Sequence, residues 1–107
     1  MANYQDGLDA VTSALAQSTR RQILDRLCTG AATSSDLSEL TSVGLPTIAK
    51  HVATLAAAGL ISSRKSGRVV THRIRPAGFD ELQAWIATRR SFWDNQLDAL
   101  DKHLEDR

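Results

Sequence analysis

This 107-residue chain has a single cysteine and no long apolar run, and one stretch of it lacks acidic side chains. The single cysteine, Cys28, excludes an intrachain disulfide and fits a reducing compartment, which predicts a cytoplasmic protein. No apolar run approaches the ~18 residues that span a bilayer. The N-terminus has neither the basic nor the apolar region of a signal peptide. We therefore expect a protein without a membrane partner.

Acidic side chains are absent from residues 40–79, which contain six basic ones. The flanking segments 1–39 and 80–107 are both net acidic, so a formal net charge of only +1 hides a strongly positive centre. A basic stretch of this kind indicates contact with nucleic acid. The alternative is a solvated charged surface with no partner, which is unusual for so many residues without one carboxylate.

Catalytic signatures are also missing from the chain. It has no glycine-rich phosphate loop, no nucleophile elbow and no paired acid–base motif. Its length suits one domain, residues 1–107, with a small core and no obvious cleft. The sequence therefore predicts a single domain that is not an enzyme and needs no cofactor.

The stretch from Leu45 to Arg75 predicts a short helix followed by a hairpin. An apolar face recurs at helical spacing, at Ile48, Val52 and Leu55. Pro46 suits the first turn of a helix, and Gly59 suits a left-handed stop just beyond its end. Two short strands then flank the turn signal Ser66-Gly67. A helix with a polar outer face and a basic hairpin together form a device for contacting the grooves and backbone of duplex DNA.

Three more helices are expected before this stretch, over residues 7–17, 19–29 and 36–41, and the apolar face of the second comprises Ile23, Leu24 and Leu27. Residues 1–6 are expected to form a loose arm, and residues 31–33 are available as a short strand against the hairpin. The predicted N-caps are Ser18 for the second helix and Ser34 or Ser35 for the third.

Several single residues also receive predictions. Cys28 is expected to be a small buried hydrophobe, and the alternative is a redox sensor with an exposed, low-pKa thiolate. Leu37 and Leu40 are expected to face inward, and His72 is expected to be a packed strand residue.

The last predicted helix, residues 79–104, is unusually long for so small a domain. About 26 residues span ~39 Å, and the helix contains both tryptophans and both phenylalanines. Such a helix leaves an apolar patch exposed unless a second copy of the chain covers it. The alternative is a helix packed wholly on its own domain. The predicted dimer interface comprises Leu8, Val11, Leu15, Phe92, Trp93, Leu97, Leu100 and Leu104.

Four segments carry a family resemblance: LAQSTRRQILDRL at 15–27, PTIAKHVATLAAAGLI at 46–61, RKSGR at 64–68 and RRSFWDNQLDAL at 89–100. Together they resemble the ArsR/SmtB family of bacterial winged helix-turn-helix regulators. The resemblance implies a mainly α fold with a small β-hairpin wing. It also implies a homodimer that binds a pseudo-palindromic operator in double-stranded DNA and represses transcription until an effector releases it.

The resemblance further assigns parts of the chain to roles. Residues 34–58 would form the helix-turn-helix, 60–75 the wing, and 7–17 with 79–104 the dimerisation helices. The implied DNA contacts are Pro46, Thr47, Lys50, His51 and Thr54 on the recognition helix and Arg64, Lys65 and Arg68 on the wing. For His51 the alternative is a partly buried histidine.

The chain departs from the family's metal-sensing members. Thr33, Ser34 and Ser35 precede Asp36-Leu37, where some members have a Cys-x-Cys pair. Asp101-Lys102-His103 matches only the first half of a second type of metal site, so we predict no metal site. An unidentified small-molecule effector near Trp85 and Trp93 is one further hypothesis, and a winged-helix module that binds a protein partner is the alternative function.

Overall fold

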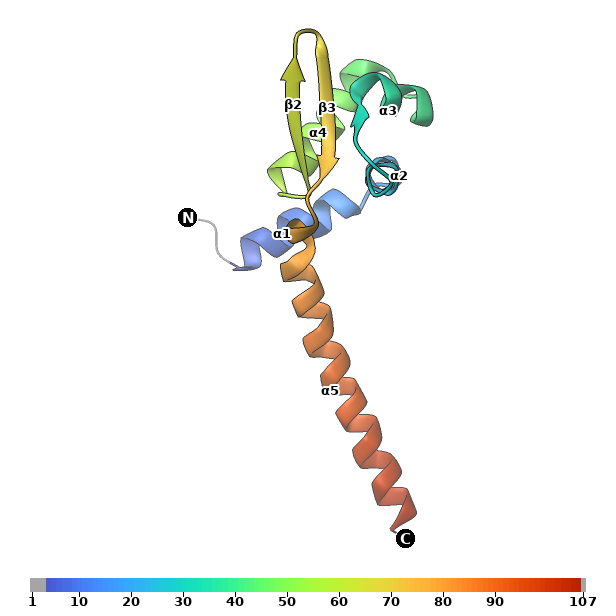
Figure 1. Ribbon diagram of the computed structural model, residues 1–107. Helices are drawn as coiled ribbons and strands as arrows, with labels where there is room; N and C mark the ends of the chain where they lie inside the picture. Colours follow the sequence, from blue (N-terminus) through green and yellow to red (C-terminus); the bar gives the residue numbers. More distant parts are fainter. Residues whose placement is uncertain (1–3, 107) are drawn as a thin grey trace.

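The computed structural model describes residues 4–106 as a bundle of four short helices, a small sheet and a long final helix (Figure 1). The elements are α1 (Tyr4–Leu15), α2 (Ser18–Leu27), β1 (Ala32–Thr33), α3 (Ser34–Thr41), α4 (Leu45–Ala57), β2 (Ile61–Ser66), β3 (Val69–Ile74), the 3-10 turn η1 (Pro76–Phe79) and α5 (Asp80–Glu105). The predicted mainly α winged-helix fold is confirmed.

The core forms where the apolar faces of α2, α3 and α4 meet the base of the wing. Its fully buried large side chains include Ile23, Leu27, Leu37, Ile48, Leu55, Leu60 and Ile61. The predicted apolar faces of α2 and α4 are therefore confirmed. The prediction for Leu40 is wrong, because this side chain is 46% exposed in the last turn of α3, where only Leu37 reaches the core.

The sheet has three antiparallel strands in the order β1-β3-β2. The short strand expected near residues 31–33 is confirmed as β1, which pairs Ala32 with His72. Between β2 and β3, Gly67 adopts a positive φ of 62°, which a residue without Cβ tolerates easily. Because β1 pairs with β3, the hairpin is held against the helix-turn-helix and does not project alone.

The start of α3 corrects the predicted cap. Thr33, not Ser34 or Ser35, is the N-cap, and its hydroxyl accepts a 3.0 Å hydrogen bond from the Asp36 N–H. The Asp36 carboxylate in turn accepts one of 3.0 Å from the Thr33 N–H, which completes a capping box. The hydrogen bonds from the Thr33 backbone and then its side chain lower the pKa of Asp36. Because Thr33 caps the helix, both serine hydroxyls are available for other contacts.

The boundaries of α2 also differ from the prediction. Ser18 is its first helical residue instead of its cap, and the helix ends at Leu27 with Cys28 as an exposed C-cap. The prediction that Cys28 is buried is therefore wrong. At the other end, Arg20 and Arg21 donate to the last carbonyls of α1, at Ser13, Ala14 and Leu15. These bonds satisfy acceptors that the end of a helix leaves unpaired.

α1 begins earlier than predicted and packs within its own protomer. Tyr4 and the next two residues are helical, so residues 4–6 are no arm, while residues 1–3 lie outside the described residues. Leu8 and Val11 are only 8% and 3% exposed, because α1 contacts α4 and the start of α5. Both were predicted at a dimer interface; their side chains pack within the protomer, and the interface itself stays a prediction. Leu15 is partly buried against the same core.

α5 leaves the domain soon after it begins. None of its residues is buried, and it runs away from the helical bundle over most of its length (Figure 1). The radius of gyration is 18.8 Å, whereas a compact chain of this length has about 13 Å.

Within residues 4–106, no helix is both long and apolar enough to cross a membrane.

Candidate nucleic-acid interface

α4 presents one apolar and one polar face, as a recognition helix requires. Ile48, Val52 and Leu55 are buried, whereas Thr47 and Lys50 are exposed on the opposite side. Pro46 and Thr54, the two other predicted contacts on this side, are exposed as well. Pro46 lies in the first turn, as predicted, and Gly44 is the N-cap. Four of the five predicted helix contacts are therefore accessible.

His51 is the exception among the predicted helix contacts. Its side chain is 8% exposed and belongs to the buried face of α4. The reason is its spacing, three residues after Ile48 and four before Leu55, which places it on the core side. Burial lowers the pKa of His51, and the positive charge of Arg20 lowers it further. The prediction that His51 points outward is wrong, and we exclude it from the proposed contacts.

The wing presents its basic side chains to solvent. Arg64, Lys65 and Arg68 are all exposed. Arg64 and Lys65 lie on β2 opposite Thr71 and Val70 of β3, and Arg68 lies in the turn. The three cations are therefore gathered at the tip of the hairpin, which packing on the helices leaves free. We call Pro46, Thr47, Lys50, Thr54, Arg64, Lys65 and Arg68 the basic surface.

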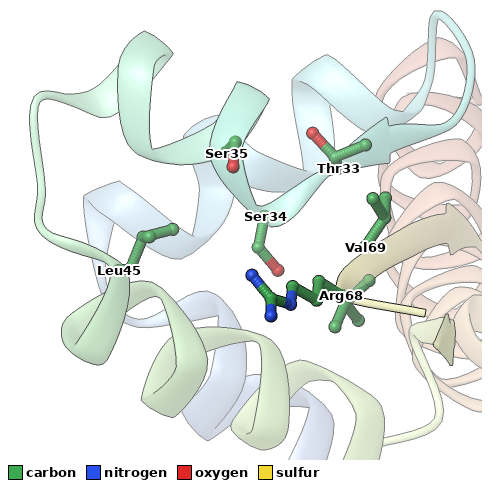
Figure 2. Close-up of a pocket in the computed structure, with 7 residues that line it drawn as sticks. Thr33, Ser34, Ser35, Leu45, Arg68 and Val69 are labelled. Carbon is green, nitrogen blue, oxygen red and sulfur yellow. The ribbon is translucent and has the colours of Figure 1, made fainter. Parts of the chain in front are cut away.

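A cavity of about 380 Å³ lies between the wing tip and the starts of α3 and α4. Its lining comprises Thr33, Ser34, Ser35, Leu45, Arg68, Val69 and Val70. Figure 2 shows the Arg68 guanidinium reaching back from the wing towards Ser34 and Leu45. Ser35, expected only as a helix cap, is thus an exposed hydroxyl beside the basic surface. This cavity is bordered by hydroxyls and a guanidinium, groups that bind phosphate oxygens well.

A buried histidine ties the wing to the helix-turn-helix. His72 on β3 is 1% exposed, which confirms its prediction as a packed strand residue. Its Nε2 lies 2.7 Å from Ser34 Oγ on α3, and its Nδ1 lies 2.7 Å from Ser63 Oγ on β2. In a neutral imidazole one nitrogen donates and the other accepts, and serine hydroxyls can do either. Three elements are therefore joined by one fully hydrogen-bonded ring.

This histidine predicts that stability falls in mild acid. Burial lowers the pKa of His72 below its ordinary value of 6.5, so the unfolded chain takes up the proton first. The stability contributed by the neutral ring is present above the unfolded-state pKa and is lost as pH falls through the folded-state pKa. We expect the urea unfolding free energy to fall between about pH 7.5 and 5.5. His72→Gln is expected to weaken the pH dependence of the unfolding free energy, while the part that comes from His51 remains. A pH dependence unchanged by His72→Gln would contradict its assignment to His72.

Residues 4–106 contain no group of three or more His, Cys, Asp or Glu side chains that could hold a metal ion. Asp101 and His103, which match half of a family metal motif, lie on the exposed end of α5. Trp85 and Trp93, proposed as an effector site, are also exposed on α5, where the Arg89 guanidinium lies 4.4 Å from the Trp85 ring centre.

Comparisons with known proteins agree with this geometry. A family model described as a helix-turn-helix domain matches residues 15–64, from the end of α1 into β2. A crystal structure of an ArsR family transcriptional regulator is 38% identical, covers 88% of this chain and 97% of its own, and has a TM-score of 0.81.

Two further relatives are a repressor and a DNA-binding domain. The transcriptional repressor SdpR of Bacillus subtilis (strain 168) is 28% identical over 90 residues, which are 84% of this chain and all of the repressor. The solution structure of a homodimeric winged helix-turn-helix DNA-binding domain from Mycobacterium bovis is 26% identical with a TM-score of 0.63, and the match covers 88% of this chain and 84% of that domain.

Proposed function

Because this chain belongs to the ArsR family of transcriptional regulators, we propose that it is a homodimer that binds a pseudo-palindromic operator in double-stranded DNA and represses transcription. One observation carries this proposal. All six basic side chains of residues 40–79 are exposed on α4, the wing and the residue that follows it, and no carboxylate in that stretch offsets them. We place the protein in the cytoplasm and assign it no catalytic step.

The two parts of the basic surface have different tasks. A recognition helix contacts base edges from its N-terminal turns, so Thr47 and Lys50 are placed to contact bases in the major groove. Arg64, Lys65 and Arg68 are placed to neutralise phosphates, which positions the protein without selecting sequence. Ser35, at the edge of the cavity beside Arg68, is placed to add a hydroxyl contact to the same backbone.

The exposed apolar side chains of α5 support the proposed dimer. Its large apolar side chains are uncovered in the protomer, and they include Phe92, Trp93, Leu97, Leu100 and Leu104. A soluble monomer rarely leaves so continuous an apolar face in water. Two copies joined through these helices would present two basic surfaces to two half-sites, as a pseudo-palindrome requires.

Lys50→Ala is expected to weaken operator binding about tenfold, the cost of one specific side-chain contact. Lys102→Ala removes the same charge from the exposed end of α5 and is the matched control, with little expected change. Fluorescence anisotropy with labelled operator measures both. Equal affinities for the two variants would show that Lys50 lies outside the DNA contact.

Salt dependence tests the wing. If the three wing cations of both protomers neutralise phosphates, and Lys50 in the groove adds its own charge, log affinity should fall with log salt at a slope of about −7. Replacing Arg64, Lys65 and Arg68 by alanine removes six of these eight charges per dimer, and the slope should fall to about −2. A slope unchanged by the triple replacement would place the phosphate contacts elsewhere.

The experiment that tests the function as a whole is selection of genomic fragments by the purified protein at about 150 mM salt, where weak phosphate contacts are screened. Recovery of an inverted repeat is the expected result. Recovery of random fragments, or of none, would overturn specific DNA binding and favour the alternative, a winged-helix module that binds a protein partner.

A further inference from the structure

The first helical residue of α4 is an exposed leucine. Leu45 is 51% exposed, whereas Ile48, Val52 and Leu55, the other large apolar side chains of this helix, are buried. Side chains of a helix lean towards its N-terminus, so Leu45 projects ahead of the first turn, the part of a recognition helix that contacts base edges. The protein core therefore leaves this apolar side chain uncovered where the proposed DNA contact begins.

α4 has few side chains that can hydrogen-bond to bases. It contains no arginine, asparagine or glutamine, the residues whose bidentate contacts most often identify guanine and adenine. Its exposed side chains with a polar group are Thr47, Lys50 and Thr54. Thymine, in contrast, is marked in the major groove by a methyl group at C5, which apolar side chains contact. The composition of α4 thus favours readout of thymine by apolar contact.

Leu45 faces the same cavity as Arg68. Both side chains line the space between the wing tip and the starts of α3 and α4. Figure 2 shows Leu45 pointing from α4 towards the space that the Arg68 guanidinium reaches from the wing. The thymine methyl group projects into the major groove beside the backbone of its own strand. One strand of the operator can therefore present a phosphate to Arg68 and a methyl group to Leu45.

We infer that Leu45 is a specificity-determining residue that contacts the 5-methyl group of one thymine in each half-site of the operator. This inference rests on the proposed function and names a base that the recognition helix selects. Removing one methyl group from an apolar contact costs about fourfold in affinity, so removing it from both half-sites should cost about fifteenfold.

Replacement of thymine by uracil tests the contact. Deoxyuridine lacks only the 5-methyl group and keeps every hydrogen-bonding group of thymine. The inverted repeat recovered by genomic selection is synthesised with deoxyuridine at one symmetric pair of thymines at a time. Fluorescence anisotropy then measures each dissociation constant. At least one symmetric pair is expected to bind about fifteenfold more weakly when it carries deoxyuridine.

Leu45→Ala assigns this loss to Leu45. The variant should bind the thymine operator about fifteenfold more weakly than wild type, and deoxyuridine at the same pair should change its affinity by less than about twofold. The slope of log affinity against log salt should stay at about −7, because an apolar contact neutralises no phosphate. The variant should fold normally, since Leu45 is half exposed and alanine is a good helix former. Circular dichroism checks this.

Leu40→Ala is the matched control. It makes the same replacement at a leucine that is 46% exposed, in the last turn of α3 and outside the basic surface. This variant should keep the wild-type affinity for the thymine operator and the full loss on deoxyuridine.

The outcomes separate this inference from the proposed function. An operator that binds equally well with deoxyuridine at every pair would overturn the methyl contact and keep specific DNA binding. A deoxyuridine loss that Leu45→Ala retains in full would assign the contact to another residue and also overturn the inference. Failure to recover any inverted repeat would overturn the proposed function itself, and the inference with it.

Discussion

Leu100→Asp is expected to convert the dimer to monomers and to lower operator affinity by about a thousandfold. Leu100 is 53% exposed in the protomer, so an aspartate there costs the monomer little. In the proposed interface the same carboxylate would be buried against apolar side chains without a partner, and that burial is costly. A monomer occupies one half-site alone and loses the coupling between the two half-sites.

Ser91→Asp is the matched control for this prediction. It adds the same charge near the middle of α5, on the face opposite Leu100, where the side chain is exposed. Sedimentation equilibrium and anisotropy with operator DNA should show a dimer of nearly wild-type affinity. A Leu100→Asp protein that remains dimeric would show that α5 is not the dimerisation helix.

Gly78→Ala is expected to lower the free energy of unfolding by about 3 kcal/mol, at the upper end of the cost of overpacking. A Cβ at Gly78 would overlap the carbonyl oxygen of Gly59 and would lie 3.1 Å from the Cα of Leu60. Both obstacles are backbone, which cannot turn aside as a flexible side chain does. The clash would separate two segments that pack closely here. Gly59 and Leu60 lead from α4 into the wing, and Gly78 leads into α5.

Gly44→Ala is the control for this second prediction. A Cβ at Gly44 would meet only Pro46 Cδ, at an ordinary distance of 3.7 Å. Alanine is a poorer N-cap than glycine, so a loss of less than about 1 kcal/mol is expected for α4. Urea denaturation measures both variants. Equal stabilities would show that the chain around Gly78 relaxes easily and that α5 is not held tightly against the wing.

Periodicity in the sequence correctly predicted most of the architecture. The apolar faces of α2 and α4, the hairpin, the strand at residues 32–33 and the long final helix all appear in the structure. These features depend on neighbours within one or two turns of the same element, and such spacing is visible in the chain itself. The basic surface was also predictable, because its charged residues all lie within one segment of the sequence, α4 and the wing.

The errors fall where a residue lies between two faces or where its neighbours come from elsewhere in the chain. His51 belongs to the buried side of α4 by its spacing, although its polarity suggested the opposite. Thr33 caps α3 because the backbone turns out of β1 at that residue, a geometry that sequence alone could not distinguish from a start at Ser34 or Ser35. Leu8 and Val11 have an apolar spacing that suits either a dimer or the protomer core.

The sequence by itself determined the order of the elements, the apolar side of most helices and the location of positive charge, because each depends on local spacing or composition. Only the tertiary structure decided that the apolar side chains of α1 are buried within its own protomer while α5 remains uncovered, and that Cys28 is exposed. It also joined Ser34, Ser63 and His72, which lie on three different elements, into one hydrogen-bonded link. A pattern of side chains in the sequence indicates that a surface must be covered. Which element covers that surface depends on what the folded chain brings beside it.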